Sequence, residues 1–216
     1  MPMPSDDTHL DASRRERRKF DLSRRIRRAA LELFHEKGYE ATTVEEIAER
    51  ADVAKGTFFN HFPRKDAILL SLGEEVLDRI EDDYGPVSTW TGTVEEQIFQ
   101  LFNAIADVAG RDRALTRVML IENTRNCWMQ SDPDPVELRF HNLLGAILEG
   151  GRARGELRAE VDLPAAVKLL QALHFATVVD WLRHESTTTS LAAAIATQLR
   201  LVCQGLCADG AGVPDA

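Results

Sequence analysis

Residues 42–65 read TTVEEIAERADVAKGTFFNHFPRK and predict two short helices joined by a tight turn. The first helix is expected over 43–50, because Thr43 followed by Glu46 is the pattern of a capping box, in which each side chain accepts a hydrogen bond from the other residue's backbone N–H. The turn that follows contains Asp52, a residue type that tolerates the left-handed backbone conformation.

The second helix is expected over 54–60 and has one apolar and one polar face. Phe58 and Phe62 are one turn apart and can pack inward, which leaves the polar side chains outward. Gly56 has no side chain and would let the backbone approach a ligand closely. This pattern fits a helix-turn-helix, whose second helix can enter the major groove of DNA, and it also fits a plain three-helix bundle with two short helices. Periodicity alone does not separate these two interpretations.

A longer helix is expected before this pair, over residues 22–37. Its apolar residues Ile26, Leu33 and Phe34 recur at helical spacing on one face. Gly38 follows as a residue that can end a helix in the left-handed conformation. Three helices in this order would form a small N-terminal unit.

Charge is distributed unevenly along the chain. The net charge is −9 over 216 residues, but the first 70 residues contain 14 Lys and Arg against 13 Asp and Glu. Residues 14–28 alone carry nine basic side chains against two acidic ones. A basic cluster on an otherwise acidic protein is typical of an arm that binds a polyanion, because neutralising phosphates releases their condensed counterions. A solubilising disordered tail would have the same composition, so both interpretations stay open.

The rest of the chain also predicts helices. Apolar residues recur every three to four positions, no sustained alternation predicts a strand, and Gly and Pro fall between the helical segments. No internal repeat of solenoid length is found. The sequence therefore predicts an all-α fold, with helices over 22–37, 43–50, 54–60, 64–83, 93–109, 111–129, 134–151, 162–184 and 189–207.

Composition argues against several other classes of protein. The longest uncharged apolar stretch, 169–179, is much shorter than the roughly 20 residues that cross a bilayer and contains polar side chains, so no membrane span is predicted. The N-terminus lacks the basic-then-apolar order of a secretory signal, and three cysteines cannot all pair with one another. We expect reduced thiols and a cytoplasmic location.

Residues 24–72 closely resemble the DNA-binding domain of the tetracycline-repressor (TetR) family of bacterial transcription regulators. The resemblance covers about a quarter of the chain and preserves the order and spacing of five motifs: A-x-x-L-F at 30–34, G-Y at 38–39, T-T-V-x-x-I-A at 42–48, K-G-T-F at 55–58 and H-F-P-x-K at 61–65. It implies a ligand-responsive dimeric regulator, expected to be a repressor. Its recognition helices would enter successive major grooves of a palindromic operator, and a small-molecule effector would release it from DNA.

The resemblance also divides the chain. We expect a flexible basic arm over 1–20, a three-helix helix-turn-helix domain over 21–67, a larger helical effector-binding and dimerisation domain over 68–208, and a flexible tail over 209–216. The helix expected over 64–83 links the two domains. An effector that shifts this helix would change the separation of the two recognition helices of a dimer.

Residues that contact DNA are carried over from the family's motifs position by position. The start of the recognition helix, at Lys55, Gly56 and Thr57, matches the positions that read bases. Phe59 stands where the family commonly has Tyr, so a hydroxyl-to-phosphate hydrogen bond is absent, and contact there is expected to be apolar or to come from Asn60 and His61. His61 can add charge near a phosphate at low pH or form hydrogen bonds as a neutral imidazole. The remaining expected contacts, to the phosphate backbone or the minor groove, are Arg24, Arg25, Arg28, Thr42, Thr43, Asn60 and Lys65.

The last two helices, over 162–184 and 189–207, are apolar on nearly every side. A helix that is apolar all round must be covered all round. A second copy of the chain could provide this cover in a symmetric four-helix interface, and the family has its dimer contact at this place. An intrachain core is the alternative. The sequence favours a homodimer.

An effector site is expected among the helices between residues 93 and 184. Small-molecule sites use apolar walls with a few polar groups, and this part of the chain supplies both. For each of these residues a place in the core is the alternative, which is the common fate of apolar side chains. The candidates are Phe99, Phe102, Met119, Asn123, Trp128, Phe140, Leu144, His174 and Phe175.

Catalysis is not predicted. Glu32 and His35 form an E-x-x-H pair, but di-iron bundles need two such pairs and two further Glu residues, and nothing completes this one. There is no P-loop, no G-x-S-x-G motif and no paired Cys/His ligand set, so neither a metal nor a cofactor is expected. A DNA-binding regulator without a small-molecule effector is the alternative function, because the same N-terminal domain would serve it.

Overall fold

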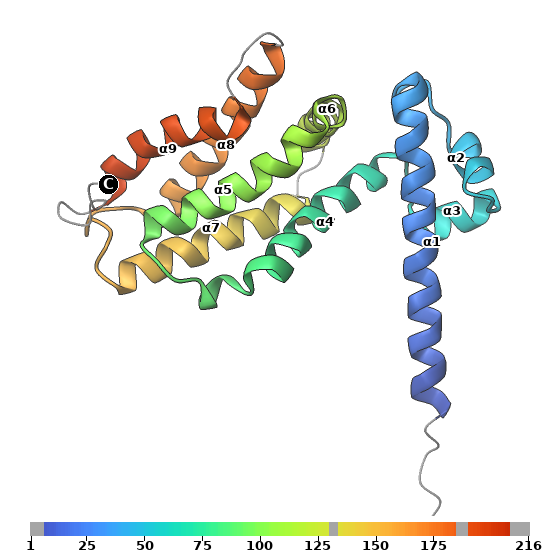
Figure 1. Cartoon of the computed structure of the whole chain (residues 1–216), viewed down its shortest axis with the longest axis horizontal. Coiled ribbons are helices and arrows are strands. Elements are labelled where there is room, and N and C mark those ends of the chain that lie inside the picture. The colour runs from blue at the N-terminus through green and yellow to red at the C-terminus, as the bar shows by residue number, and fades with distance from the viewer. Residues whose placement is uncertain (1–6, 130–133, 185–189, 208–216) are drawn as a thin grey trace, which may run out of the picture. The chain divides into compact units, whose positions relative to one another are not determined.

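The computed structural model describes residues 7–129, 134–184 and 190–207, and within these ranges the chain is helical without a β-strand. One residue pair in these ranges, Leu157 with Cys207, forms an isolated antiparallel bridge. The predicted all-α fold is confirmed. The elements, labelled in Figure 1, are α1 (Asp7–Lys37), α2 (Val44–Arg50), α3 (Lys55–His61), α4 (Asp66–Tyr84), the 3-10 helix η1 (Val87–Thr89), α5 (Val94–Arg111), α6 (Arg113–Met129), α7 (Pro135–Ala153), α8 (Leu163–Arg183) and α9 (Leu191–Leu206).

Helices α2 to α9 begin and end within two residues of the positions expected from the sequence. Local sequence explains this agreement, since a side-chain oxygen that accepts a hydrogen bond from the third helical N–H starts each of five helices. The residues that supply it are Thr43, Thr93, Asp134, Asp162 and Ser190.

Helix α1 differs from the expectation of a flexible arm over 1–20. It begins at Asp7 and continues through the basic cluster to Lys37. The reason is local: residues 7–37 contain neither Gly nor Pro, and the cluster is rich in Arg, whose helix propensity is high. The expected tail over 209–216 lies outside the described residues.

The chain forms two compact units, Met1–Leu69 and Leu70–Ala216. The division falls two residues after the boundary expected between 67 and 68, inside α4. Unit 1 therefore contains α1, α2, α3 and the first turn of α4, and unit 2 contains the remainder of α4 and all later helices.

Unit 1 is built around the apolar faces that the sequence predicts. Helix α1 packs against α2, and α2 packs against α3. Ile26, Ile47, Phe58 and Ile68 are fully buried between them. Helix α3 is held against this core through Phe58, and the opposite side of α3 lies on the surface.

Unit 2 is a helical bundle with one core. Helix α5 packs against α7 and α9, and α8 packs against α7 and α9, so that these four helices surround the core in Figure 1. Helix α6 contacts α5 and α8. The largest fully buried side chains of this core are Ile98, Leu101, Phe102, Leu144, Ile147, Leu148, Leu170 and Ile195.

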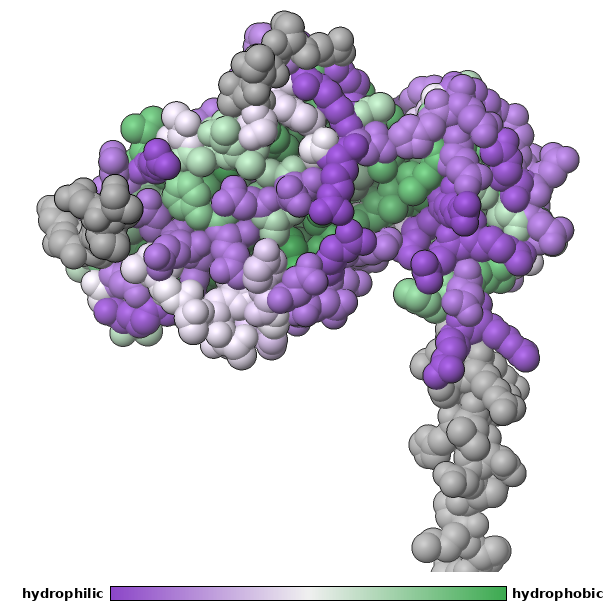
Figure 2. Space-filling model, in the orientation of Figure 1, coloured by the Kyte–Doolittle hydropathy of each residue, from purple (hydrophilic) through white to green (hydrophobic). Residues whose placement is uncertain are grey.

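Helix α8 is long and apolar enough, by length and composition alone, to cross a bilayer. Its inner face nevertheless lies in the core of unit 2, where Val167, Leu170 and Val178 are buried. This packing marks α8 as a core helix. Figure 2 shows hydrophobic residues reaching the surface among the helices of unit 2, and Leu169 and Phe175 are large exposed examples on α8.

Candidate DNA-binding surface and effector site

The N-terminus of α2 is held by the capping box that the sequence predicts. Thr43 Oγ1 accepts a hydrogen bond from the backbone N of Glu46 at 3.3 Å, and Glu46 Oε2 accepts one from the backbone N of Thr43 at 2.8 Å. Lys37, in the last turn of α1, forms an ion pair with the same carboxylate. Its hydrogen bond, with those from Thr43, lowers the pKa of Glu46 to about 2. The start of α2 is thereby fastened to the end of α1.

The turn between α2 and α3 has the expected left-handed residue. Asp52 has a φ of +50°, and its carbonyl oxygen accepts a hydrogen bond from Arg25 Nη2 at 2.8 Å. Arg25 therefore ties the turn to α1. Arg25 is nevertheless exposed, so its side chain lies at the surface beside this turn.

Helix α3 presents an open polar face. Lys55, Gly56 and Asn60 are exposed, and no atom outside the helix backbone lies within 4 Å of the place where a Cβ of Gly56 would be. Phe59 is 45 % exposed, whereas Phe58 is completely buried. The face that carries Lys55 and Gly56 can therefore approach a partner without moving a side chain of the core.

Lys55 has two neighbours within unit 1. Its ammonium group pairs with the Glu45 carboxylate on α2 and lies 5.9 Å from the centre of the Phe59 ring. The hydrogen bond from Lys55 holds the pKa of Glu45 below its usual range. Sequence reasoning missed this pair, because the angle between α2 and α3 decides which side chains meet.

His61 is partly buried at the end of α3 and its Nδ1 is 3.0 Å from Ser23 Oγ on α1. Burial lowers the pKa of His61, and the positive charge of Lys19 lowers it further. Of the two roles left open by the sequence, this environment favours the neutral imidazole.

Lys65 and Thr42 hold the connection between α1 and α2. Lys65 Nζ donates hydrogen bonds to the carbonyl oxygens of Tyr39 at 2.7 Å and Thr42 at 3.0 Å, and it lies 4.1 Å from the centre of the Tyr39 ring. Thr42 is only 2 % exposed, and its hydroxyl donates to the carbonyl of Gly38 at 2.8 Å. Thr42 therefore faces the interior and not a DNA partner.

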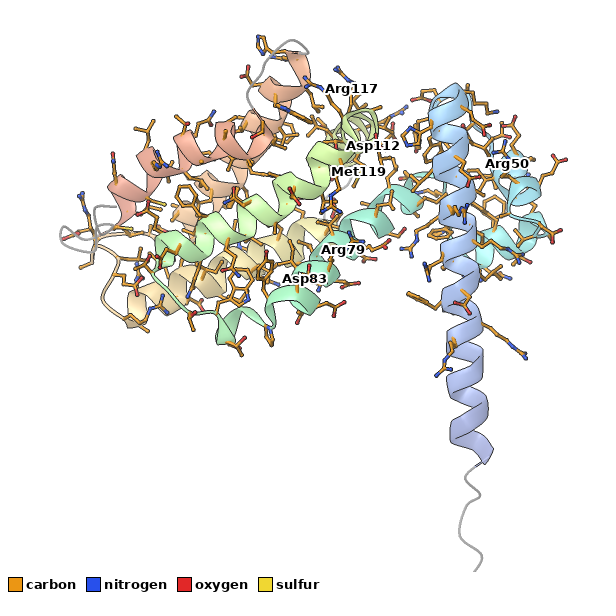
Figure 3. All side chains as sticks on the ribbon, in the orientation of Figure 1. Arg50, Arg79, Asp83, Asp112, Arg117 and Met119 are labelled. Atoms are coloured by element: carbon orange, nitrogen blue, oxygen red, sulfur yellow. The ribbon has the colours of Figure 1, made fainter. Side chains whose placement is uncertain are left out.

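Arginines on α1 and α2 line the surface of unit 1. Arg24 is exposed and its guanidinium lies 6.0 Å from the centre of the Phe20 ring. Arg28 is exposed as well and pairs with Glu32 on the same helix. Arg50 on α2, labelled in Figure 3, donates two hydrogen bonds of 2.8 Å to Glu36 on α1. This bidentate pair, which the sequence did not predict, braces α2 against α1.

The candidate effector residues lie in different surroundings. Phe102, Phe140 and His174 come together between α5, α7 and α8, while Met119, labelled in Figure 3, lies on α6. The side chain of Trp128 lies outside the described residues. The structure places the others as follows: buried, Leu144; partly buried, Phe99; exposed, Asn123 and Phe175.

The three grouped side chains form an aromatic cluster. The ring of His174 is 5.5 Å from that of Phe102 and 5.5 Å from that of Phe140, and the two phenylalanine rings are 5.7 Å apart. The Nε2 atom of His174 is buried and has no hydrogen-bond partner among the described residues. Burial lowers the pKa of His174 to about 4, so the imidazole is neutral near pH 7.

Two arginines of α6 bind the C-terminal end of α8, which the sequence did not predict. Arg113 donates a hydrogen bond to the Trp181 carbonyl and lies 4.3 Å from the centre of that ring, and Arg117 donates to the Leu182 carbonyl at 2.6 Å. Carbonyls in the last turn of a helix lack helical partners and attract cations. The preference of helix C-termini for cations is the signal from which the roles of Arg113 and Arg117 could have been predicted. Arg117 and its neighbour Asp112 are labelled in Figure 3.

Comparison with known proteins identifies the family. The sequence model for bacterial regulatory proteins of the tetR family matches residues 26–72, which include all of α2 and α3. A crystal structure of FadR from Thermus thermophilus, a TetR-family transcriptional repressor in complex with lauroyl-CoA, is 30% identical, covers 90% of this chain and 100% of its own, and has a TM-score of 0.66. The chain belongs to the TetR family. It is a DNA-binding transcriptional regulator.

Two further TetR-family relatives extend the comparison over most of the chain. FadR from Bacillus subtilis, in complex with stearoyl-CoA, is 26% identical with a TM-score of 0.67 and covers 84% of this chain and 97% of its own. The transcriptional repressor KstR of Rhodococcus jostii is 29% identical over 212 residues, 97% of this chain and 91% of KstR. These relatives are transcriptional regulators and not enzymes. The TetR resemblance drawn from residues 24–72 is confirmed.

Proposed function

We propose that this TetR-family protein is a dimeric repressor that binds a palindromic operator through α3 and releases it when a small-molecule effector binds. The open face of α3 carries the proposal. Lys55 and Gly56 are exposed on it, α2 is fixed behind it by a capping box, and arginines of α1 lie on the same unit. A short helix with such a face fits the major groove, which is about 12 Å wide.

The proposed contacts follow from exposure and chemistry. Lys55, Gly56 and Thr57 would meet base edges, because they form the first turn of α3. The backbone would be held by residues around this turn and on α1, which are Arg24, Arg25, Arg28, Thr43, Phe59, Asn60, His61 and Lys65. Thr42 would support this surface from inside, since its side chain is buried.

A homodimer would form through α8 and α9. Leu169 and Phe175 on α8 and Leu201 on α9 are large apolar side chains that are 51 %, 42 % and 69 % exposed. A two-fold axis would bring the same patch of both copies together and remove it from water. The two copies of α3 would then be available for two half-sites of the operator.

The effector proposed for this chain is a long-chain acyl-CoA thioester. The two FadR structures that are 30% and 26% identical to it hold lauroyl-CoA and stearoyl-CoA. The relation extends through unit 2, since the first of them covers 90% of this chain. A regulator of this kind would work in the cytoplasm, where its operator lies. The alternative is a regulator of DNA without an effector.

The test is binding of the purified protein to a labelled duplex from the region upstream of its own gene, followed by fluorescence anisotropy. We expect Lys55→Ala and Thr57→Ala to lose about 1 to 3 kcal/mol on the operator and little on a scrambled duplex. Arg24→Ala, which removes only a proposed backbone contact, should weaken both duplexes alike. Equal losses on both duplexes for Lys55→Ala would contradict base reading by α3.

The complex of the protein with the labelled duplex also tests whether an effector releases the DNA. Lauroyl-CoA should lower the anisotropy of the bound duplex and raise the melting temperature of the free protein, because a ligand that binds the folded state stabilises it. Free CoA is the control without an acyl chain. If neither lauroyl-CoA nor a metabolite extract raises the melting temperature, the alternative of a regulator without an effector is correct.

A further inference from the structure

Two buried side-chain nitrogens of unit 2, Arg113 Nε and His174 Nε2, lack a hydrogen-bond partner among the described residues. The guanidinium of Arg113 donates through another nitrogen to the Trp181 carbonyl. His174 Nε2 is buried, and no donor or acceptor among the described residues is within hydrogen-bond reach of it. The ring of His174 lies beside Phe102 of α5 and Phe140 of α7, and the three ring centroids form a triangle with sides of 5.5, 5.5 and 5.7 Å. Aromatic rings supply no hydrogen bond of comparable strength to an imidazole nitrogen.

Neighbouring polar side chains in unit 2 are satisfied. His141, next to Phe140 on α7, has its Nδ1 3.0 Å from Gln171 Oε1 on α8. Thr177, one turn after His174, donates a hydrogen bond to the carbonyl of Leu173 and is 2.7 Å from Gln198 Oε1. The contact between these helices therefore provides partners for the polar groups around His174 but none for its Nε2 atom.

An unpaired buried nitrogen is unfavourable and rare in native proteins. A hydrogen-bond partner of His174 Nε2 must therefore come from outside the described residues. Because burial lowers the pKa of the imidazole, the ring is neutral and offers one N–H donor and one lone pair.

In the tautomer that carries the proton on Nε2, His174 is an uncharged donor beside two aromatic rings, and this restricts the chemistry of its partner. A free carboxylate would have to lose its hydration against two apolar rings, which is costly without a countercharge. A ketone, ester or thioester carbonyl carries no charge and accepts one hydrogen bond, and its hydrocarbon part can lie against the rings of Phe102 and Phe140. This combination of one acceptor and an apolar body is typical of small-molecule sites.

We propose that His174 Nε2 donates a hydrogen bond to the carbonyl oxygen of the effector, and that Phe102 and Phe140 contact the hydrocarbon beside this carbonyl. The inference rests on the proposed function and adds to it the position of the acyl thioester. It makes His174 the residue that distinguishes a thioester or ester from a free fatty acid.

The experiment uses the full-length protein, lauroyl-CoA as the probe and two variants that carry the same substitution. His174→Phe should weaken lauroyl-CoA binding, measured by calorimetry, about tenfold, which corresponds to the loss of one hydrogen bond. It should leave the melting temperature of the free protein unchanged or raise it, because an unpaired nitrogen is removed. His141→Phe is the control: it should lower the melting temperature, since it leaves Gln171 without its partner, and keep the affinity for lauroyl-CoA.

A second measurement uses the wild-type protein, so its result does not depend on how a variant folds. In the wild-type protein labelled with ¹⁵N-histidine, the Nε2 signal of His174 should shift on addition of lauroyl-CoA and stay unchanged on addition of free CoA. An Nε2 signal that stays in place while lauroyl-CoA binds would overturn the proposal.

The remaining outcomes distinguish a failure of the role proposed for His174 from a failure of the proposed effector. If the wild type binds lauroyl-CoA and His174→Phe binds it equally well, the role of His174 is wrong and the proposed effector stands. If the wild type binds its operator but not lauroyl-CoA, both the effector class and the role of His174 are wrong. A melting temperature of free His174→Phe that falls as far as that of His141→Phe would show that water satisfies Nε2 in a structural role, which also overturns the proposal.

Discussion

At the scale of single residues, the proposed DNA-binding face of unit 1 contains a carboxylate that would compete with DNA for Lys55. Glu45 occupies the ammonium group of Lys55, and the side chains of both residues are more than half exposed. An exposed ion pair of this kind contributes little to stability, so a phosphate or a base can displace the carboxylate. In the proposed complex the displaced carboxylate would remain next to the DNA and repel its phosphates. Glu45 would therefore weaken binding to all sequences and leave base reading to the complementary contacts.

Replacing Glu45 by Gln should raise the affinity for operator and scrambled duplexes alike, by severalfold at low salt, because a negative charge near the phosphates is removed. Anisotropy titrations over a series of salt concentrations measure this. The double variant with Lys55→Ala separates two contributions: it should remove the part of the gain that comes from freeing Lys55 and keep the part that comes from the removed charge. Glu49→Gln is the control on the same helix, since Glu49 forms no ion pair among the described residues. A gain confined to the operator would refute this role.

His174 makes stability depend on pH in a defined direction. Its pKa is about 4 in the folded protein and near 6.5 when unfolded, so below pH 6.5 the unfolded state binds a proton that the folded state does not. Stability from this group is therefore complete above about pH 6.5 and is lost as the pH falls toward 4, by up to about 1.4 kcal/mol per pH unit. Urea unfolding at fixed protein concentration between pH 7 and 4.5 should show a shallower decline for His174→Phe than for the wild type. Parallel declines would contradict the assignment.

The exposure of residues within helices was predictable from the sequence, but the exposure of loop residues and the partners of side chains were not. Helical spacing correctly placed Phe58 inside and Lys55 outside, because the period of a helix fixes which side a residue faces. It could not show that Lys65 binds two carbonyls of the α1–α2 connection or that Thr42 is buried, since both depend on how a loop folds between two helices.

At the scale of helices, the contact between α5 and α7 depends on one glycine. A Cβ on Gly151 of α7 would lie 2.8 Å from two side-chain carbons of Val94, the first residue of α5. Close approach also lets Glu156, after α7, accept a hydrogen bond from the backbone N of Val94. The start of α5 is thereby fixed against the end of α7.

Gly151→Ala should destabilise the protein, because the added methyl group pushes α5 away from α7. Overpacking of this kind costs about 1 to 3 kcal/mol, which exceeds the gain of at most about 1 kcal/mol from replacing glycine in a helix. Gly145→Ala in the same helix is the control, since nothing lies within 4 Å of its Cβ position, and it should be neutral or stabilising. Urea unfolding of both variants measures the difference. Equal stability of the two would show that α5 can shift without loss.

Helix ends were predicted well where capping residues, glycine or proline mark them, as at Thr93 and Asp162. The start of α1 was not, because nothing in residues 7–22 interrupts a helix and the cluster of like charges was taken as a sign of a flexible arm. Helix propensity and charge repulsion oppose each other in such a segment, and the sequence pattern does not give their balance.

At the scale of the whole molecule, charge separates the two functions. Residues 71–216 carry 12 Lys and Arg against 22 Asp and Glu, whereas residues 1–70 are nearly balanced and contain the basic cluster. The acidic part is repelled by DNA, so an approaching duplex is directed to unit 1. The effector domain can then change its ligand without competing for DNA. Helical spacing identified the apolar residues of α8 and α9 but not the surface that covers them, because in the proposed dimer that surface belongs to a second molecule.

Leu201→Glu should disrupt the proposed dimer. Leu201 is 69 % exposed on α9, and a second copy would bury it near the two-fold axis together with its symmetry mate, so the substitution would place two negative charges in a desolvated contact. Sedimentation at micromolar concentration should show a monomer for this variant and a dimer for the wild type. Operator affinity should fall as well, since a monomer binds only one half-site. Leu138→Glu, at a side chain on α7 that is 49 % exposed, is the control and should remain dimeric. A Leu201→Glu variant that sediments as a dimer would move the interface away from this part of α9.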